Sequence, residues 1–121
     1  MIYIVDIDET ICHTPTLDGK RDYANSTPIQ SRIDLINKLY DDGNIIQYWT
    51  ARGSSSGLDW TDFTLKQLTH WGCKFHSCRC GKPSYDVWID DKAISDKDFF
   101  NDSNEYGSNQ GVGVRKGSYD F

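Results

Sequence analysis

The sequence predicts an α/β fold built on a mainly parallel sheet. Short apolar runs at residues 2–5, 44–49 and 86–90 have the length and the β-branched or aromatic content of buried strands. After each of the first two runs, apolar residues recur at helical spacing. Strands that alternate with helices form βαβ units, whose strands lie parallel in one sheet with right-handed crossovers.

Chain length and composition restrict the class of protein. The 121 residues are expected to form a single domain, with a core over residues 1–100 and an irregular tail over residues 101–121 that is rich in Gly, Ser and Asn. The formal net charge of −5 argues against nucleic acid or an anionic membrane as the main partner. The oligomeric state is left open by the sequence.

The expected location is the cytoplasm. No apolar run approaches the roughly 18 residues that a membrane span needs, and Asp6 and Asp8 come too early for a secretion signal. The four cysteines are therefore expected to be free thiols or metal ligands rather than disulfides.

The first half of the chain contains a strand, a flap and a helix. Residues 11–26, with Pro15 and Gly19, are expected to form a loop or small hairpin. A helix is predicted over residues 27–43, with Thr27 as N-cap, Pro28 at the first helical position and Gly43 as terminator. It follows the first strand and covers one face of the sheet.

The second half repeats this pattern. The strand over residues 44–49 leads into a flexible loop at 53–57 and a helix over 59–71 that Gly72 ends. A short third strand is predicted at 73–76, a loop at 77–83 and a further strand at 86–90. Ser95 is expected to cap a short last helix through Phe99 and Phe100.

Polar residues follow these predicted strands directly, and the carboxyl ends of parallel strands meet at one edge of a sheet. The residues that converge there by topology are Asp6, Asp8, Thr50, Asp90 and Asp91. A carboxylate at the tip of an apolar strand is costly to bury unless a cation or donors compensate it. The first strand end therefore predicts a metal ion or a basic partner.

This set of residues can support phosphoryl transfer. An ionised Asp can attack phosphorus and form an aspartyl phosphate, and Mg²⁺ prefers hard oxygen ligands while keeping several waters. The predicted Mg²⁺ ligands are Asp6, the backbone carbonyl of Asp8, Asp90 and Asp91. The predicted catalytic residues are Asp6 as nucleophile, Asp8 as general acid and base, and Thr50 and Lys82 as stabilisers of phosphoryl charge.

The same residues resemble the four motifs of the haloacid dehalogenase superfamily, in the right order over about residues 1–95. The matching motifs are Asp6-Ile-Asp8-Glu-Thr10, Thr50, Lys82 and Asp90-Asp91. The resemblance implies a Rossmann-like three-layer α/β/α sandwich, dependence on Mg²⁺ and phosphatase rather than dehalogenase chemistry. Because the segments after Ile11 and after Thr50 are short, the chain is similar to capless members of the superfamily, such as small phosphatases associated with capsule or surface sugars.

A cluster of Cys and His residues suggests a second metal. Tetrahedral Zn²⁺ takes four such ligands, and the candidates within eleven residues are His70, Cys73, His76, Cys78 and Cys80. The end of this segment resembles the zinc loop of heptose bisphosphate phosphatases, but the paired ligands expected upstream are not at matching spacing. Buried Cys without a ligand is common, so free thiols are favoured over zinc.

The favoured function is that of a Mg²⁺-dependent phosphomonoesterase acting on a small phosphate ester, such as a sugar phosphate. Arg52 either binds the phosphate or carboxylate of the substrate or pairs with a surface acid. Two alternatives stay open: an uncapped site that accepts a macromolecular or polynucleotide phosphate, and a catalytically silent binding domain of the same fold. The residues that select the substrate are expected in the loops at 12–25 and 52–58.

Overall fold

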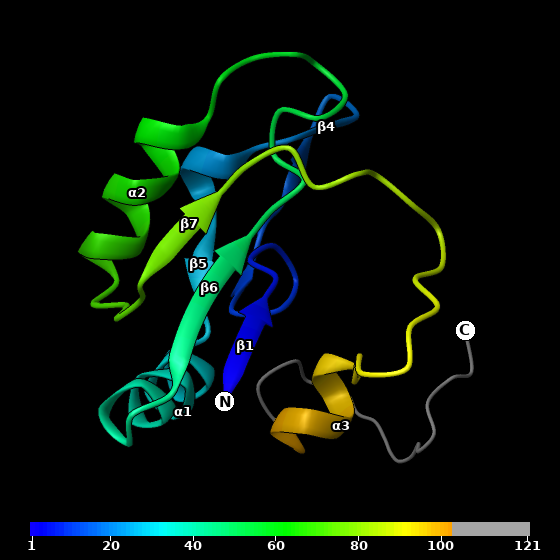
Figure 1. Ribbon diagram of the computed structural model, residues 1–121. Helices are drawn as coiled ribbons and strands as arrows, with labels where there is room; N and C mark the ends of the chain where they lie inside the picture. The colour runs from blue at the N-terminus through cyan, green and yellow to red at the C-terminus, as the bar shows by residue number, and fades with distance from the viewer. Residues whose placement is uncertain (103–121) are drawn as a thin grey trace. The chain divides into compact units, whose positions relative to one another are not determined.

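The structure, a computed structural model, describes residues 1–102 (Figure 1). It divides into two compact units, Met1–Ser84 and a second that begins at Tyr85. Of the tail predicted over residues 101–121, all but the first two residues lie outside the described part of the chain.

The first unit is built on a parallel sheet of three strands in the order β1-β6-β7. These strands are β1 (Ile2–Val5), β6 (Ile45–Trp49) and β7 (Ser77–Arg79). Helix α1 (Gln30–Asp41) packs against β6, and helix α2 (Thr61–His70) lies beside β7 (Figure 1). The predicted α/β class with a mainly parallel sheet is confirmed.

The segment between β1 and α1, residues 11–26, is called the flap below. It contains strand β2 (Cys12–His13), the hairpin of β3 (Thr16–Leu17) with β4 (Lys20–Arg21), and the 3-10 helix η1 (Tyr23–Asn25). Asp18 and Gly19 make the two-residue turn of the hairpin with φ values of 53° and 76°. An Asp-Gly pair favours this turn because Gly, and to a lesser extent Asp, tolerate positive φ.

The first helix begins later than the sequence predicts. Thr27 and Pro28 form strand β5 (Thr27–Pro28), which pairs with β2, and α1 begins after Ile29. The prediction that Thr27 caps the helix is therefore wrong. Pairing with β2 uses the backbone of Thr27, and it holds the end of the flap against the residues that follow Asp8.

Two predicted strands are also corrected. The third strand runs over Ser77–Arg79 rather than 73–76, because Cys73 N–H still bonds to the Leu68 carbonyl and closes the end of α2. Residues 86–90 are irregular instead of a strand. The Asp90 carboxylate accepts Lys92 N–H at 3.0 Å, and side-chain bonds of this kind favour turns over strands.

The core lies between the sheet and the two helices. Burial alternates along β6, where Ile46 and Tyr48 are buried and Ile45 is exposed, so one face of the sheet packs against the helices. Ile33 and Ile36 of α1 supply the facing side chains. Within the described residues, no helix has the length and apolar character that crossing a membrane requires.

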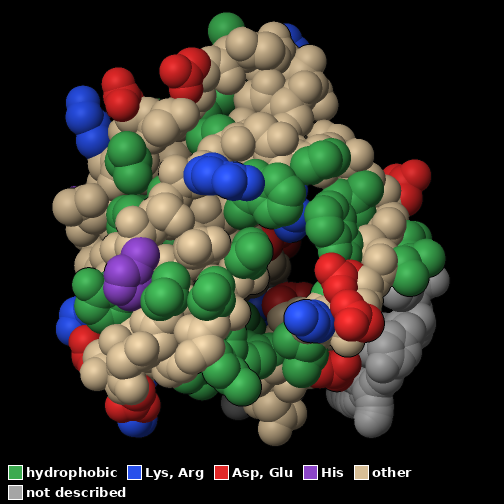
Figure 2. Space-filling view, viewed as in Figure 1, with side chains coloured by type: hydrophobic (Ala, Val, Ile, Leu, Met, Phe, Trp, Pro, Cys, Tyr) green, Lys and Arg blue, Asp and Glu red, His purple; other side chains and the backbone are tan. Residues whose placement is uncertain are grey.

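The second unit holds a short helix, α3 (Asp96–Phe100). The Ser95 hydroxyl accepts Asp98 N–H at 3.3 Å, which is the predicted N-cap. On the face shown in Figure 2, the described Lys and Arg side chains are scattered and do not form one basic patch.

Neighbouring residues of α1 test the position of the core. Ile36 is 1% exposed, whereas Leu35 is 38% exposed. Ile36→Ala is expected to lower the free energy of unfolding by about 2–5 kcal/mol, because it removes buried methyl groups and leaves a cavity. Leu35→Ala, the matched control, is expected to cost below about 1 kcal/mol. Urea denaturation measures both, and equal losses would contradict this placement of the core.

Candidate active site

The candidate site lies where the parallel strands of the first unit end. Asp6 follows β1, Thr50 follows β6 and Lys82 follows β7 by a short loop. Thr50 N–H bonds to the Arg79 carbonyl, and Lys82 N–H bonds to the Thr50 carbonyl at 2.9 Å. Pairing thus continues past the strands and brings Lys82 next to Thr50.

Asp6 has little compensation for its charge. Its side chain is 37% exposed, and Lys82 Nζ lies 3.9 Å from Oδ1. Burial raises the pKa of Asp6 above its ordinary value. The charge of Lys82, with hydrogen bonds from the Ile7 backbone and the Thr10 side chain, offsets this rise only in part. The arrangement leaves a carboxylate that would gain from a further cation.

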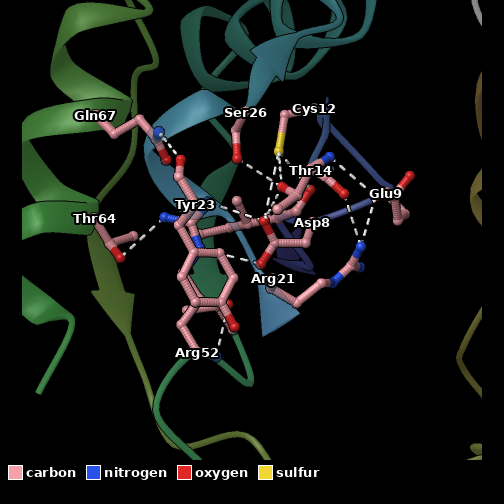
Figure 3. Close-up of polar contacts among 12 residues, drawn as sticks. Asp8, Glu9, Cys12, Thr14, Arg21, Tyr23, Ser26, Arg52, Thr64 and Gln67 are labelled. Carbon is pink, nitrogen blue, oxygen red and sulfur yellow. Dashed lines mark hydrogen bonds and ion pairs between the residues drawn. The ribbon is translucent and has the colours of Figure 1, made fainter. Parts of the chain in front are cut away.

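Asp8 is compensated from several sides. Arg52 Nε lies 3.1 Å from Oδ2 and Arg52 Nη2 lies 2.9 Å from Oδ1, which makes a bidentate ion pair. The Thr14 hydroxyl donates to Oδ1 as well, and it lies 2.7 Å from the Ser26 hydroxyl (Figure 3). The Arg52 side chain is fully buried and that of Asp8 is 13% exposed, so the pair lies largely out of water.

Arg52 also joins the flap to α2. Its Nη1 donates to the Thr64 hydroxyl at 3.2 Å, and the Tyr23 ring lies over the guanidinium with its centroid 4.6 Å from Cζ (Figure 3). Gln67 of α2 donates to the Tyr23 carbonyl at 2.8 Å. The sequence predicts that Arg52 either binds the substrate or pairs with a surface acid. In the structure, Arg52 is buried and contacts Asp8.

Glu9 fixes the turn that follows Asp8. Its φ of 62° is left-handed, which is rare for a residue with a side chain. Its carboxylate accepts Thr14 N–H at 3.0 Å and Arg21 Nη1 at 3.1 Å, and it contacts His13 Nδ1 at 3.0 Å. These bonds hold the start of the flap in place and with it the Thr14 hydroxyl on Asp8.

Thr50 is buried and can still donate a hydrogen bond. Its Oγ1 accepts Arg52 N–H at 3.2 Å, which leaves the Thr50 O–H as a donor. Gly53 follows with φ of 85°, and a side chain there would collide with the Leu58 carbonyl. Gly53 therefore permits the close loop that turns the chain away from the site after Arg52.

Asp90 and Asp91 belong to the second unit. Asp90 accepts hydrogen bonds from Lys92 N–H and from Trp88 Nε1, and the bond from Lys92 lowers the pKa of Asp90 below its ordinary value. The part of both carboxylates in a metal site stays a prediction from the sequence.

The candidate zinc ligands lie on different elements. His70 is in the last turn of α2 and Cys78 is in β7. His76 Nδ1 accepts Ile46 N–H at 3.1 Å, and its ring stacks on Tyr40. Burial raises the pKa of Cys73 to about 12 and that of Cys78 to about 11. The prediction from the sequence, which favours free thiols over zinc at these residues and at Cys80, can be tested by metal analysis of the purified protein.

The donor chemistry of the first unit fits Mg²⁺ better than a soft metal. Asp6 offers a carboxylate and the chain at Asp8 offers a backbone carbonyl, and both are hard oxygen ligands. No group of three or more His, Cys, Asp or Glu side chains in the described residues is arranged to hold an ion. Mg²⁺ often binds through one or two carboxylates and keeps its waters, so two protein donors are compatible with it.

Several residues of the site were not predicted from the sequence. Three residues contact the Asp8–Arg52 pair, two from the flap and one from α2: Thr14, Tyr23 and Thr64. Thr14 and Tyr23 lie in the flap, where no hydrophobic period indicates their orientation. Thr64 occupies a buried position of α2. A polar residue on the buried face of a helix is the signal that could have identified it from the sequence.

No family model and no curated protein sequence matches the chain. The fold is similar to that in the crystal structure of a structural genomics target from Vibrio cholerae, with a TM-score of 0.71 and 23% sequence identity. The match covers 82% of this chain and 86% of that chain. The two proteins therefore share a fold.

Proposed function

We propose that this protein is a Mg²⁺-dependent phosphomonoesterase of the haloacid dehalogenase type, with a capless, Rossmann-like α/β/α fold. The observation that carries the proposal is the grouping of Asp6, Thr50 and Lys82 at one sheet edge, with Lys82 Nζ 3.9 Å from the Asp6 carboxylate. A small phosphate ester, such as a sugar phosphate, is the proposed substrate.

The residues divide the chemistry between them. Asp6 attacks phosphorus and forms the aspartyl phosphate, while the leaving oxygen departs on the opposite side. The Thr50 O–H donates to a phosphoryl oxygen, and Lys82 offsets the negative charge that develops there. Asp8 exchanges a proton with the leaving oxygen and then with the attacking water.

The charge of Asp6 supports the assignment of the metal. Its carboxylate is partly buried beside a single described ion-pair partner, Lys82, so a second cation would lower the cost of ionising it. Mg²⁺, when bound by Asp6 and the Asp8 carbonyl, would supply charge that reduces repulsion between the carboxylate and the phosphate. Asp90 and Asp91 are the further ligands that the sequence predicts.

Activity should depend on Asp6 and on Mg²⁺. In a phosphate-release assay over sugar phosphates, nucleotides and an aryl phosphate, Asp6→Asn is expected to lose at least about 10³-fold in turnover, because the amide is not a nucleophile. EDTA is expected to reduce wild-type activity to background, and added Mg²⁺ to restore it. Asp34→Asn, at an exposed position of α1, is the matched control. Equal phosphate release by wild type and Asp6→Asn would refute the mechanism.

The pKa of Asp6 predicts how stability varies with pH. Because the folded-state pKa is raised, the folded state holds this proton more tightly, and stability is lost as the pH rises through the folded pKa. Without metal at pH 7, Asp6→Asn is therefore expected to be more stable than wild type. The difference is expected to be less than about 1 kcal/mol, because the Asp6 side chain is partly hydrated.

This difference is expected to shrink as the pH falls toward 3.8, the ordinary pKa of the group, because the carboxyl is then protonated in both states. Added Mg²⁺ is expected to stabilise wild type and to leave the variant unchanged. Urea denaturation over a range of pH, with EDTA or Mg²⁺, measures both effects. A variant less stable than wild type in EDTA at pH 7 would contradict the uncompensated charge.

The two carboxylates of the second unit can be separated by their effect on the metal. Asp90→Asn and Asp91→Asn are compared by titrating activity with Mg²⁺. Substitution of the residue that binds the ion directly is expected to raise the half-maximal Mg²⁺ concentration about 10–100-fold. The other substitution is expected to have a smaller effect, and no change in either variant would exclude both from the metal site.

A further inference from the structure

Arg52 is held in place by hydrogen bonds and by a contact with an aromatic ring. Each of its three side-chain nitrogens donates to another side chain: Nε and Nη2 to Asp8, and Nη1 to Thr64. Its backbone N–H donates to Thr50, and the Tyr23 ring covers the guanidinium. With 1% of its surface exposed, the residue is oriented by protein groups rather than open to a ligand.

These contacts determine the orientation of the Asp8 carboxylate. Both Asp8 oxygens accept hydrogen bonds from Arg52, and Oδ1 also accepts one from the Thr14 hydroxyl. These donors fix the orientation of the Asp8 carboxylate, and with it the direction from which Asp8 takes up and returns a proton.

We propose that Arg52 is a positioning residue that holds the Asp8 carboxylate as the proton acceptor for hydrolysis of the aspartyl phosphate, an inference that rests on the proposed function. In that step a water oxygen bonds to phosphorus, and the bond from phosphorus to the Asp6 oxygen breaks. The electron pair of that bond returns to the Asp6 carboxylate. The water proton passes to Asp8, and inorganic phosphate is released.

Two other roles for Arg52 lead to different kinetics. If Arg52 bound substrate phosphate, its loss would weaken the first step and lower kcat/KM. If it were only structural, its loss would reduce the amount of folded protein and leave kcat per active site unchanged. A positioning role in the second step lowers kcat and KM together and leaves kcat/KM nearly constant, because the aspartyl phosphate accumulates.

The test uses p-nitrophenyl phosphate with Mg²⁺, because nitrophenolate leaves without needing a proton and the first step is then independent of Asp8. Rapid-quench kinetics of Arg52→Gln are expected to show a burst of nitrophenolate equal to the active sites. The steady rate that follows is expected to be at least about 100-fold below wild type, the effect of losing a positioned base, with kcat/KM changed less than about threefold. Acid-quenched protein should carry the phosphoryl group on Asp6.

Further variants guard against loss of folding. Arg52→Gln leaves Asp8 buried without its partner, whereas Arg52→Lys keeps the charge and the double variant with Asp8→Asn removes both charges. Arg52→Lys is expected to be intermediate in kcat. The double variant is expected to be no slower than Asp8→Asn alone, because the two residues act as one unit. Arg79→Gln, an exposed arginine that lies over Trp49, is the matched control and should behave as wild type.

Each contrary result has a distinct meaning. A fall in kcat/KM without a burst, together with effects of Arg52→Gln and Asp8→Asn that multiply, would overturn the positioning role in favour of substrate contact. Unchanged kcat per active site in Arg52→Gln would reduce the residue to a structural one. If wild type hydrolysed no phosphate ester at all, the proposed function would fail and this inference with it.

Discussion

The parallel register of β1 with β6 is the constraint on which the candidate site depends. Val5 pairs with Tyr48, so the two strands end at nearly the same level, and Asp6 and Thr50 leave the sheet side by side. Side chains alternate between the faces of a strand, so a slip of one residue would turn Tyr48 and Ile46 out of the core. Burial of these two side chains therefore fixes the register, and the register fixes the site.

The Asp8–Arg52 pair imposes a second constraint, because removing two charges from water is costly unless donors and acceptors are satisfied. The structure satisfies them with three residues from two segments: Thr14 and Tyr23 of the flap, and Thr64 of α2. The flap buries Ile11 and Cys12 at its start, and the residues that follow are mainly polar. Its order therefore depends on the buried pair as much as the pair depends on the flap, which explains why a segment without hydrophobic periodicity has a defined conformation.

The sequence was sufficient where one physical rule dominates. Apolar runs and helical spacing located β1, β6, α1 and α2 to within a few residues, and the strand ends marked Asp6 and Thr50. It was not sufficient where tertiary contacts decide. Thr27 looks like an N-cap but pairs with the flap, and residues 86–90 have strand composition without strand conformation. The partner of Arg52 lies 44 residues away in the sequence, and no local pattern encodes such a contact.

The two carboxylates that follow β1 differ in how closely a cation compensates them, although one residue separates them. Asp8 has a bidentate guanidinium at 2.9–3.1 Å, whereas Asp6 has an ammonium group at 3.9 Å and is more exposed. A cation approaching this edge of the sheet therefore gains more from Asp6 than from the side chain of Asp8, whose oxygens already accept from Arg52. The same difference supports the proposed division of roles, in which the more exposed carboxylate of Asp6 binds metal and attacks phosphorus and the enclosed carboxylate of Asp8 exchanges protons.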